Sequence, residues 1–299
     1  MRKFDTNKLV RTGAVVAGAV LLGWAAFGIY RWQVRRTQVA ANRTELARLG
    51  LPGDGTKDFM PLPAILPHSA GAARLGEDLF ADKRLARTSR RTCTSCHWLN
   101  MGGSDGKIHG RFMTRPIVNA AATTRFLHDG SFTNFTDAAK LMLTDGTYAG
   151  GGSLDEIVAR LAADSQLVAG FARVYPTGLT GENLLDALEQ YGRTLLSAGR
   201  PFDRFQGGDD HALDEQAKAG FALFRRKNCL ACHQGPVLGG HKVYEDRKVT
   251  PLRGIGLRRV FLSDASSTDI ATALSRMPSG DREWTAEERA ALTAFLKTL

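Results

Sequence analysis

The chain carries one short pattern twice, as Cys93-Thr94-Ser95-Cys96-His97 and again as Cys229-Leu230-Ala231-Cys232-His233. Both stretches read Cys-x-x-Cys-His, the attachment signature of c-type haem. Two thiols at this spacing can reach the two vinyl groups on one porphyrin edge, and the following His can turn its imidazole onto the iron as an axial ligand. The motifs use all four cysteines of the chain, so none remains for a disulfide. We therefore expect two covalently bound haems, one on each motif.

Cysteine pairs have two other common uses, as a redox dithiol and as half of a zinc site. A redox dithiol does not need a His directly after each pair. A four-thiolate zinc site usually draws its two pairs from positions much closer in the chain than these. The sequence favours haem over both alternatives.

Length and composition indicate a globular protein with many loops. The 299 residues suit one long or two ordinary domains, and a hydrophobic content of 43% allows a real core. Thirty-two glycines and ten prolines are typical of a backbone that wraps cofactors. The net charge of +10 favours acidic redox partners or an anionic membrane surface. Nothing resembles a nucleic-acid-binding module, so we do not expect nucleic acid as a partner.

The N-terminal region contains a candidate membrane anchor. Residues 12–30 carry no charge, and a helix of this length rises about 28 Å, enough to cross a bilayer core. Trp24, Tyr30 and Trp32 lie where interfacial aromatic residues often occur. A cleaved signal peptide normally has a shorter apolar region, and no clear cleavage site follows Tyr30. We expect an uncleaved anchor within residues 1–32. Because c-type haem is attached outside the cytoplasm, the globular part should face the periplasm.

The remaining chain divides into a stem and two haem domains. Residues 33–68 contain several prolines that break regular structure, so we expect a plain spacer there. From residue 69 the apolar spacing becomes helical, which predicts an N-terminal haem domain over 69–205 and a C-terminal one over 206–299. The expected elements are helices at 136–143, 154–175, 180–196, 213–224 and 285–299, and a long loop at 98–131.

The two domains show signs of an internal duplication. Each haem motif follows a predicted helix with a Leu-Phe pair, Leu79-Phe80 in the first and Leu223-Phe224 in the second. Thr285 and Glu288 form a capping box for the last helix. The predicted fold is mainly α with long loops, in which two tandem cytochrome c-like domains follow an N-terminal transmembrane helix.

With these motifs the chain resembles the bacterial dihaem cytochrome c peroxidases and their MauG-type relatives, from about Leu75 to Leu299. The resemblance rests on the two haem motifs at this separation and on their flanking stretches. These stretches are Leu75–Leu85, Arg125–Gly130, Pro201–Phe205, Gly220–Cys229, Cys232–Pro236, Thr250–Arg253 and Ala294–Leu299.

The resemblance implies a division of labour between the haems. The C-terminal haem, on His233, takes electrons from a donor, and the N-terminal haem, on His97, is the reaction site. Met277 falls where the family's distal methionine lies, and a thioether ligand raises the potential of an electron-transfer haem. The alternative is that Met277 is an ordinary core or surface residue. Weaker candidates for this ligand are Met101, Met113 and Met142.

The resemblance also implies a gating ligand at the first haem. His109 matches the family's switchable distal histidine, which occupies the iron in the resting oxidised state and leaves when the other haem is reduced. Gly106 and Gly110 flank it in a flexible stretch. The alternative is a solvent-exposed loop histidine.

Three departures from the family pattern qualify this expectation. The family has a proton-transferring Glu followed by Gln, where this chain has Asp137 with a shorter side chain. Asp137 is the proton-transfer candidate, and a solvated helix residue is the alternative. The family often has a Trp before Asp-Gly, where this chain has His128, a poorer carrier of an electron hole. The loop that supplies an Asn to an inter-haem calcium is one residue short near Arg115. Thr250 and Pro251 then remain as matching candidates, so calcium is left open.

We therefore expect a membrane-anchored dihaem peroxidase that reduces hydrogen peroxide with electrons from a small cytochrome c or cupredoxin. A dihaem electron carrier without peroxidase activity is one alternative, and a MauG-type enzyme that oxidises a partner protein is another. The absence of a Trp at the position of His128 counts against a MauG-type enzyme. Dimers are common in the resembled family, so a homodimer is compatible with the sequence.

Overall fold

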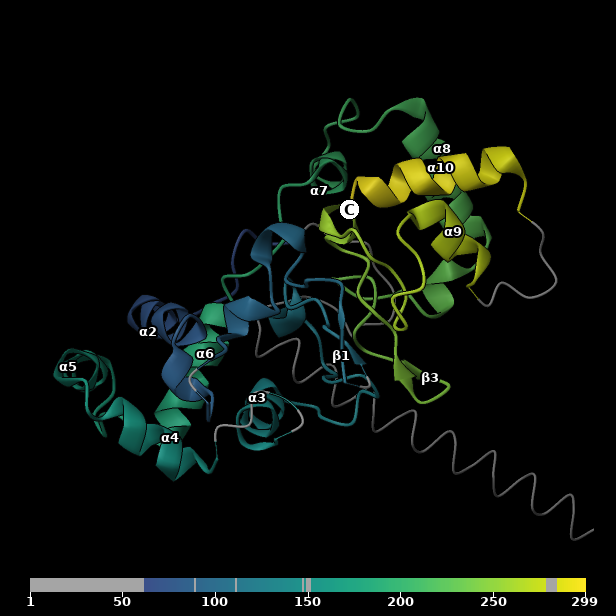
Figure 1. Ribbon diagram of the computed structural model, residues 1–299. Helices are drawn as coiled ribbons and strands as arrows, with labels where there is room; N and C mark the ends of the chain where they lie inside the picture. Colours follow the sequence, from purple (N-terminus) through teal and green to yellow (C-terminus); the bar gives the residue numbers. More distant parts are fainter. Residues whose placement is uncertain (1–61, 89, 111, 147, 149–151, 278–283) are drawn as a thin grey trace, which may run out of the picture.

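The computed structural model describes residues 62–299, with the exception of 89, 111, 147, 149–151 and 278–283. In this part of the chain two groups of helices stand on either side of a region of loops and short hairpins (Figure 1). No helix among the described residues is long and apolar enough to span a bilayer. The anchor expected over 12–30 lies outside the described residues and stays a prediction.

The first half is built on a pair of packed helices, α2 and α6, with three further helices around them. Its core contains buried Leu79, Ile157, Leu161, Phe171 and Leu184. The helices of this half are α2 (Ala70–Phe80), α3 (Phe135–Thr144), α4 (Leu154–Leu161), α5 (Ser165–Val174) and α6 (Gly181–Gly192).

The second half has its own core and the same central arrangement, with α8 packed on α10. Buried Phe202, Leu223, Phe295 and Leu299 belong to this core. The helix α7 therefore packs with the second half. The helices of this half are α7 (Pro201–Gln206), α8 (Glu215–Arg226), α9 (Ile270–Ser275) and α10 (Ala286–Lys297).

Each half also contains a two-stranded antiparallel hairpin that follows its haem motif in the sequence. The strands are β1 (Ile108–His109) with β2 (Phe112–Met113), and β3 (Val243–Tyr244) with β4 (Arg247–Lys248). The first hairpin lies inside the stretch predicted as a loop, where Gly106 and Gly110 adopt positive φ angles of 69° and 68°. Glycine makes such backbone accessible without steric cost.

The duplication extends through the loops of both halves. Equivalent positions of the two halves are 135 residues apart, as Arg115 and Thr250 are. This interval relates the two hairpins, because Ile108 pairs with Met113 in the first and Val243 pairs with Lys248 in the second. It also relates two isolated bridges, Phe126 with Phe132 and Phe261 with Ser267. Asn134 and Asp269, the N-caps of α3 and α9, share the interval as well. The weak duplication expected from the Leu-Phe pairs is therefore a repeated backbone.

Local capping explains where several helices begin and end. The expected single helix over 154–175 is wrong, because the Asp164 side chain accepts hydrogen bonds from the backbone of Gln166 and Leu167 and starts α5 as a separate helix. The helix expected over 180–196 ends at Gly192. The capping box of Thr285 and Glu288 is confirmed at the start of α10.

The end of the expected stem is not a plain spacer. Leu62 and Leu66 are buried in a cluster with Ala121, Ala122 and Val237, which come from both halves. The backbone N–H of Leu62 donates to Asp203, and that of Leu66 donates to the carbonyl of Arg193. Residues 62–66 therefore help to hold the two halves together.

Two buried polar contacts lie beside this connection, one within the second half and one between the halves. Arg253, which is 1% exposed, forms a 2.5 Å ion pair with the buried Asp203. Asn119 is fully buried, and its side-chain amide donates to Ser197 Oγ at 2.8 Å and to the carbonyl of Arg253 at 3.0 Å. A single side chain thus contacts segments of both halves.

Candidate haem-binding sites

The two Cys-x-x-Cys-His motifs have the same local backbone. Each opens with a short 3-10 turn, at Cys93–Ser95 and at Cys229–Ala231. In each motif the N–H of the His donates to the carbonyl of the first Cys, at 2.9 Å in both cases. The helix α8 leads directly into the second turn, whereas α2 ends at Phe80 well before the first motif and contacts it through the Phe80 ring, whose centroid lies 6.3 Å from that of His97.

The motif histidines are oriented as axial ligands require. Nδ1 of His97 lies 2.9 Å from the carbonyl oxygen of Gly103, and Nδ1 of His233 lies 3.3 Å from that of Leu238. Because a carbonyl oxygen only accepts, Nδ1 carries the proton and Nε2 keeps its lone pair for a metal. Burial lowers the pKa of both rings, that of His233 to about 4, so both are neutral at pH 7. A neutral imidazole is the form that binds iron.

The motif thiols do not have the character of a redox dithiol. Burial raises the pKa of the Cys93 thiol to about 11, and burial together with Asp105 raises that of Cys96. Redox-active thiols need a lowered pKa. Among the described residues, the two cysteine pairs do not meet in one cluster of metal-ligating atoms, as a shared zinc site would require. Both alternatives to haem therefore lose support.

A group of cationic side chains between the two halves fits the propionate carboxylates of haem. Burial lowers the pKa of Lys248 to about 7, of Arg115 to about 10 and of Arg258 to about 9, and for all three a neighbouring positive charge lowers it further. Nε of Arg115 and of Arg258 is buried without a hydrogen-bond partner. Clustered, half-buried cations of this kind call for an anion. We name Arg115, Lys248 and Arg258 the cationic cluster.

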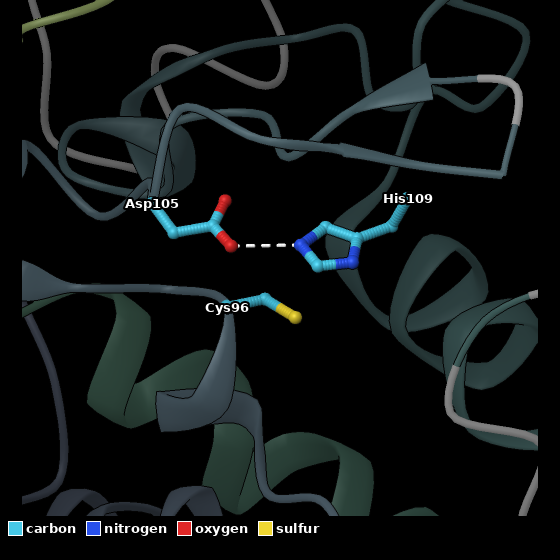
Figure 2. A group of neighbouring side chains, drawn as sticks. All are labelled: Cys96, Asp105 and His109. Carbon is cyan, nitrogen blue, oxygen red and sulfur yellow. Dashed lines mark hydrogen bonds and ion pairs between the residues drawn. The ribbon is translucent and has the colours of Figure 1, made fainter.

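His109 lies beside the first haem motif. Its Nε2 is 2.7 Å from Oδ2 of Asp105, and these atoms lie within 4.8 Å of the Cys96 sulfur (Figure 2). The Asp105 carboxylate is buried, whereas the His109 ring is 39% exposed. Burial opposes ionisation of Asp105, but hydrogen bonds from His109 and from the Lys107 backbone lower its pKa overall. The structure thus brings the predicted gating residue to the first motif, while its ligation stays a prediction.

Asp137 lies in the first turn of α3 and points to solvent. Its side chain accepts from Asn134 at 2.5 Å, and its backbone N–H donates back to the Asn134 side chain at 2.8 Å. These contacts serve the N-terminal cap of α3. No contact joins Asp137 to His97 or His109 among the described residues, so its role in proton transfer stays a prediction.

Met277 lies just after α9, at the edge of the segment 278–283 that is not described. The 135-residue interval places Met142 of α3 at the equivalent position of the first half. Both methionines are partly buried. The structure leaves the ligation of Met277 as a prediction and adds a counterpart that sequence reasoning ranked low.

His128 stacks on Phe112, with ring centroids 4.1 Å apart and an interplanar angle of 20°. Its backbone carbonyl accepts from the N–H of Lys248, so the residue lies where the two halves meet. Burial and the charges of Arg115 and Lys248 lower the pKa of His128 to about 4. The ring is therefore neutral at pH 7.

Sequence reasoning missed Asp105, the cationic cluster and the buried His241. The i, i+4 spacing of Asp105 and His109 was the only local signal, and it lies in a stretch predicted as a long loop, where the structure has His109 on β1 and Asp105 just before it. His241 lies 3.0 Å from the Thr124 hydroxyl and is 1% exposed. The cluster arises from segments more than a hundred residues apart, which no local pattern connects.

Comparison with known proteins decides the family. The family model described as "Di-haem cytochrome c peroxidase" and bearing the short name CCP_MauG matches residues 70–211. A cytochrome c peroxidase of Escherichia coli is 34% identical over 263 residues, which are 84% of this chain. The chain belongs to the dihaem cytochrome c peroxidase and MauG family. A second model, described as subunit III of a cbb3-type cytochrome c oxidase, matches residues 215–296, consistent with a cytochrome c-like second half.

The similar proteins differ in how far the match extends. The chain spans 52% of the E. coli peroxidase, about half of its length. A cytochrome c551 peroxidase of Nitrosomonas europaea is 28% identical, over 81% of this chain and 83% of that protein. The methylamine utilization protein MauG of Methylophilus methylotrophus is 31% identical, over 59% of this chain and 56% of that protein.

Solved structures share the fold. A MauG-like protein associated with microbial copper homeostasis superposes with a TM-score of 0.66 at 20% identity, covering 83% of this chain and 94% of that one. The dihaem peroxidase BthA of Burkholderia thailandensis gives 0.65 at 14% identity, covering 82% and 92%. At these identities the likeness concerns the fold.

Proposed function

We propose that this chain is a dihaem c-type peroxidase that reduces hydrogen peroxide to water with electrons from a small donor protein. Each turnover would take two electrons and two protons and yield two waters. The family, whose similar members include proteins named as peroxidases, supports this reaction. The observation that carries the proposal is the His109–Asp105 pair beside Cys96, because the equivalent hairpin of the second half carries Tyr244 in place of His109.

The two sites would then have different tasks. Haem iron supplies the redox chemistry at each site, with His97 and His233 as the axial ligands from the attachment motifs. His109 stands on a short hairpin between two glycines, which suits a side chain that has to move. Asp105 is anchored in the fold and holds the exposed ring of His109 by one hydrogen bond. We propose that this bond positions His109 and that Asp137 is the candidate for moving a proton.

Electron entry is proposed at the second site, through the haem on His233 with Met277 as its second ligand. The net charge of +10 suits an acidic donor, such as a small cytochrome c or a cupredoxin. We propose a periplasmic location, because c-type haem is attached outside the cytoplasm. A membrane anchor over residues 12–30 is part of this proposal.

The test is a turnover assay on the haem-loaded protein. Oxidised and half-reduced protein are each mixed with hydrogen peroxide, and oxidation of a reduced small cytochrome c is followed in wild type, Asp105→Asn and His109→Ala. The proposal expects rapid turnover in wild type and an altered need for prior half reduction in both variants. An exposed histidine elsewhere, in His211→Ala, is the matched control and should behave as wild type. If peroxide leaves half-reduced wild type without turnover, the proposal fails.

A dihaem electron carrier is the second candidate, and one observation favours it. Met142 occupies in the first half the position that Met277 occupies in the second, so both haems have a candidate thioether ligand. Two six-coordinate haems would transfer electrons without binding peroxide. Replacement of Met142 by Leu separates the candidates, because loss of a low-spin signal from the first haem would support the carrier.

A MauG-type oxidation of a partner protein has less support. That chemistry needs a residue between the haems that carries an electron hole. His128 lies between the halves, stacked on Phe112, and its buried neutral ring is a poorer carrier than an indole.

A further inference from the structure

The side chain of Arg115 ties the first half to the second. Nη1 donates to Oγ1 of Thr250 at 2.9 Å, and Nη2 donates to the carbonyl of Lys248 at 3.1 Å. The same Nη2 lies 3.5 Å from the carbonyl of His128, in its own half. One guanidinium thus gathers three oxygens, two from residues 248–250 of the second half and one from the first half.

One of these oxygens belongs to Thr250, on which a calcium site in this family would depend. Thr250 and Pro251 are the two residues that the family resemblance offers as calcium ligands in this half. The Thr250 hydroxyl accepts from Arg115, and the Pro251 carbonyl accepts from Nη2 of Arg258 at 2.8 Å. Both are therefore already bound to arginine nitrogens.

The charge of the surroundings also disfavours a divalent cation. Calcium binds six to eight oxygens, usually including carboxylates. Here the groups that act on Arg115, Lys248 and Arg258 are one another and Arg247, all of them cations. Among the described residues, the carboxylate that acts on this region is that of the exposed Asp129, through His128. The residues present do not fit calcium.

We infer that the Arg115 guanidinium takes the place of the inter-haem calcium, so that this protein joins its halves with a built-in cation and needs no calcium. A guanidinium is suited to the task because it is permanently charged and directs several donors in fixed geometry. The side chain is fixed to the fold, so the joint persists when the calcium concentration falls. This inference is independent of the peroxidase proposal, because it concerns how the halves are joined.

The first experiment measures calcium on the haem-loaded wild-type protein. Protein prepared in millimolar calcium is passed through a desalting column, its metal content is determined, and its melting temperature is recorded with calcium and with EGTA. We expect less than stoichiometric calcium and the same melting temperature in both buffers. A filled specific site at saturating calcium would raise the melting temperature by about 5 °C or more. One bound calcium per chain with such a rise would overturn the inference.

The second experiment removes the built-in cation. Arg115→Gln should melt several degrees below wild type in EGTA, because the oxygens of Thr250 and Lys248 lose their charged donor. Arg259→Gln removes the same charge from an exposed position nearby and should melt as wild type does. An Arg115→Gln protein that melts with wild type would contradict the inference. If this variant does not load haem, Arg115→Lys, which keeps the charge, should load it, and the wild-type calcium measurement still decides.

Discussion

The two halves share one backbone arrangement and differ in the side chains at equivalent positions. Asn119 and Gly254 stand at equivalent positions with the same left-handed backbone, at φ angles of 68° and 76°. Next to them, the first half has a buried Val118 where the second has the buried Arg253. Likewise His109 of the first half corresponds to Tyr244 of the second, and Arg115 corresponds to Thr250.

This difference teaches how a duplicated module acquires two tasks. The repeated backbone places a haem motif in each half, so either haem is held in the same way. The side chains compared above lie at the hairpins and where the halves meet, and we propose that there they set the ligation of the first haem and the joining of the halves. Fold and function are thus encoded at different positions of the same repeat.

The largest expected effect separates the two axial histidines. His97→Ala and His233→Ala should each lower peroxide turnover at least about 100-fold, because even outer partners of metal ligands contribute 10- to 100-fold. They should differ in electron uptake. His97→Ala should still accept an electron from the donor at the second haem, and His233→Ala should not. Stopped-flow spectra of donor oxidation measure this step, and the reverse pattern would exchange the assigned roles.

The buried ion pair of Arg253 with Asp203 exists on only one side of the repeat. Arg253→Met leaves the Asp203 carboxylate buried without its cation, which should lower the free energy of unfolding by about 3–5 kcal/mol. Val118→Ala, at the equivalent position, should cost about 1–3 kcal/mol, as an ordinary core truncation does. Guanidinium denaturation of both variants measures the difference. Equal losses would show that the charged pair contributes nothing particular to the second half.

His241 is a titrating group of the second half without a counterpart in the first, since Gly106 stands at the equivalent place before β1. Burial and the charge of Lys248 lower the pKa of His241 to about 4, from about 6.5 in an unfolded chain. Between these values the unfolded chain binds the proton and the folded one does not. The stability is therefore fully present above pH 6.5 and is lost as the pH falls toward 4, by at most about 3 kcal/mol.

His241→Gln should weaken this dependence, because glutamine can still contact Thr124 but does not titrate. Urea midpoints at pH 7, 5 and 4 provide the measurement, with exposed His211→Gln as the matched control. An unchanged loss of stability on acidification in His241→Gln would show that other groups cause it.

The smallest effects test the helix pairs that the two halves share. A Cβ at Gly76 would clash with the carbonyl oxygen of Ala187, and one at Gly220 would clash with that of Ala291. Gly76→Ala should weaken the packing of α2 on α6, and Gly220→Ala that of α8 on α10. Each should lower the free energy of unfolding by about 1–3 kcal/mol. Hydrogen exchange should show each loss in its own half. Gly146→Ala, which has open space around it, is the control, and full tolerance of either variant would contradict the shared packing.

The repeat also explains what sequence reasoning could reach. The haem motifs and the last helix with its capping box were predictable because their signals lie within a few residues. The break at Asp164 was missed because the apolar spacing of α4 and α5 continues across it, and a single side-chain cap decides the boundary. The packing of Leu62 and Leu66 and the bonds of Arg115 depend on segments that only the folded chain brings together. Local sequence patterns thus predict the repeated backbone, whereas the contacts that distinguish the two halves join segments far apart in the sequence.

The most direct test of this division is a potentiometric titration of the haem-loaded protein, followed by its visible and electron paramagnetic resonance spectra. We predict two well-separated one-electron steps. Met277→Leu should lower only the higher of the two potentials, and Met142→Leu should leave that potential unchanged. If the two potentials coincide, or if Met142→Leu moves the higher potential and Met277→Leu moves neither, the proposed division between the two halves is contradicted.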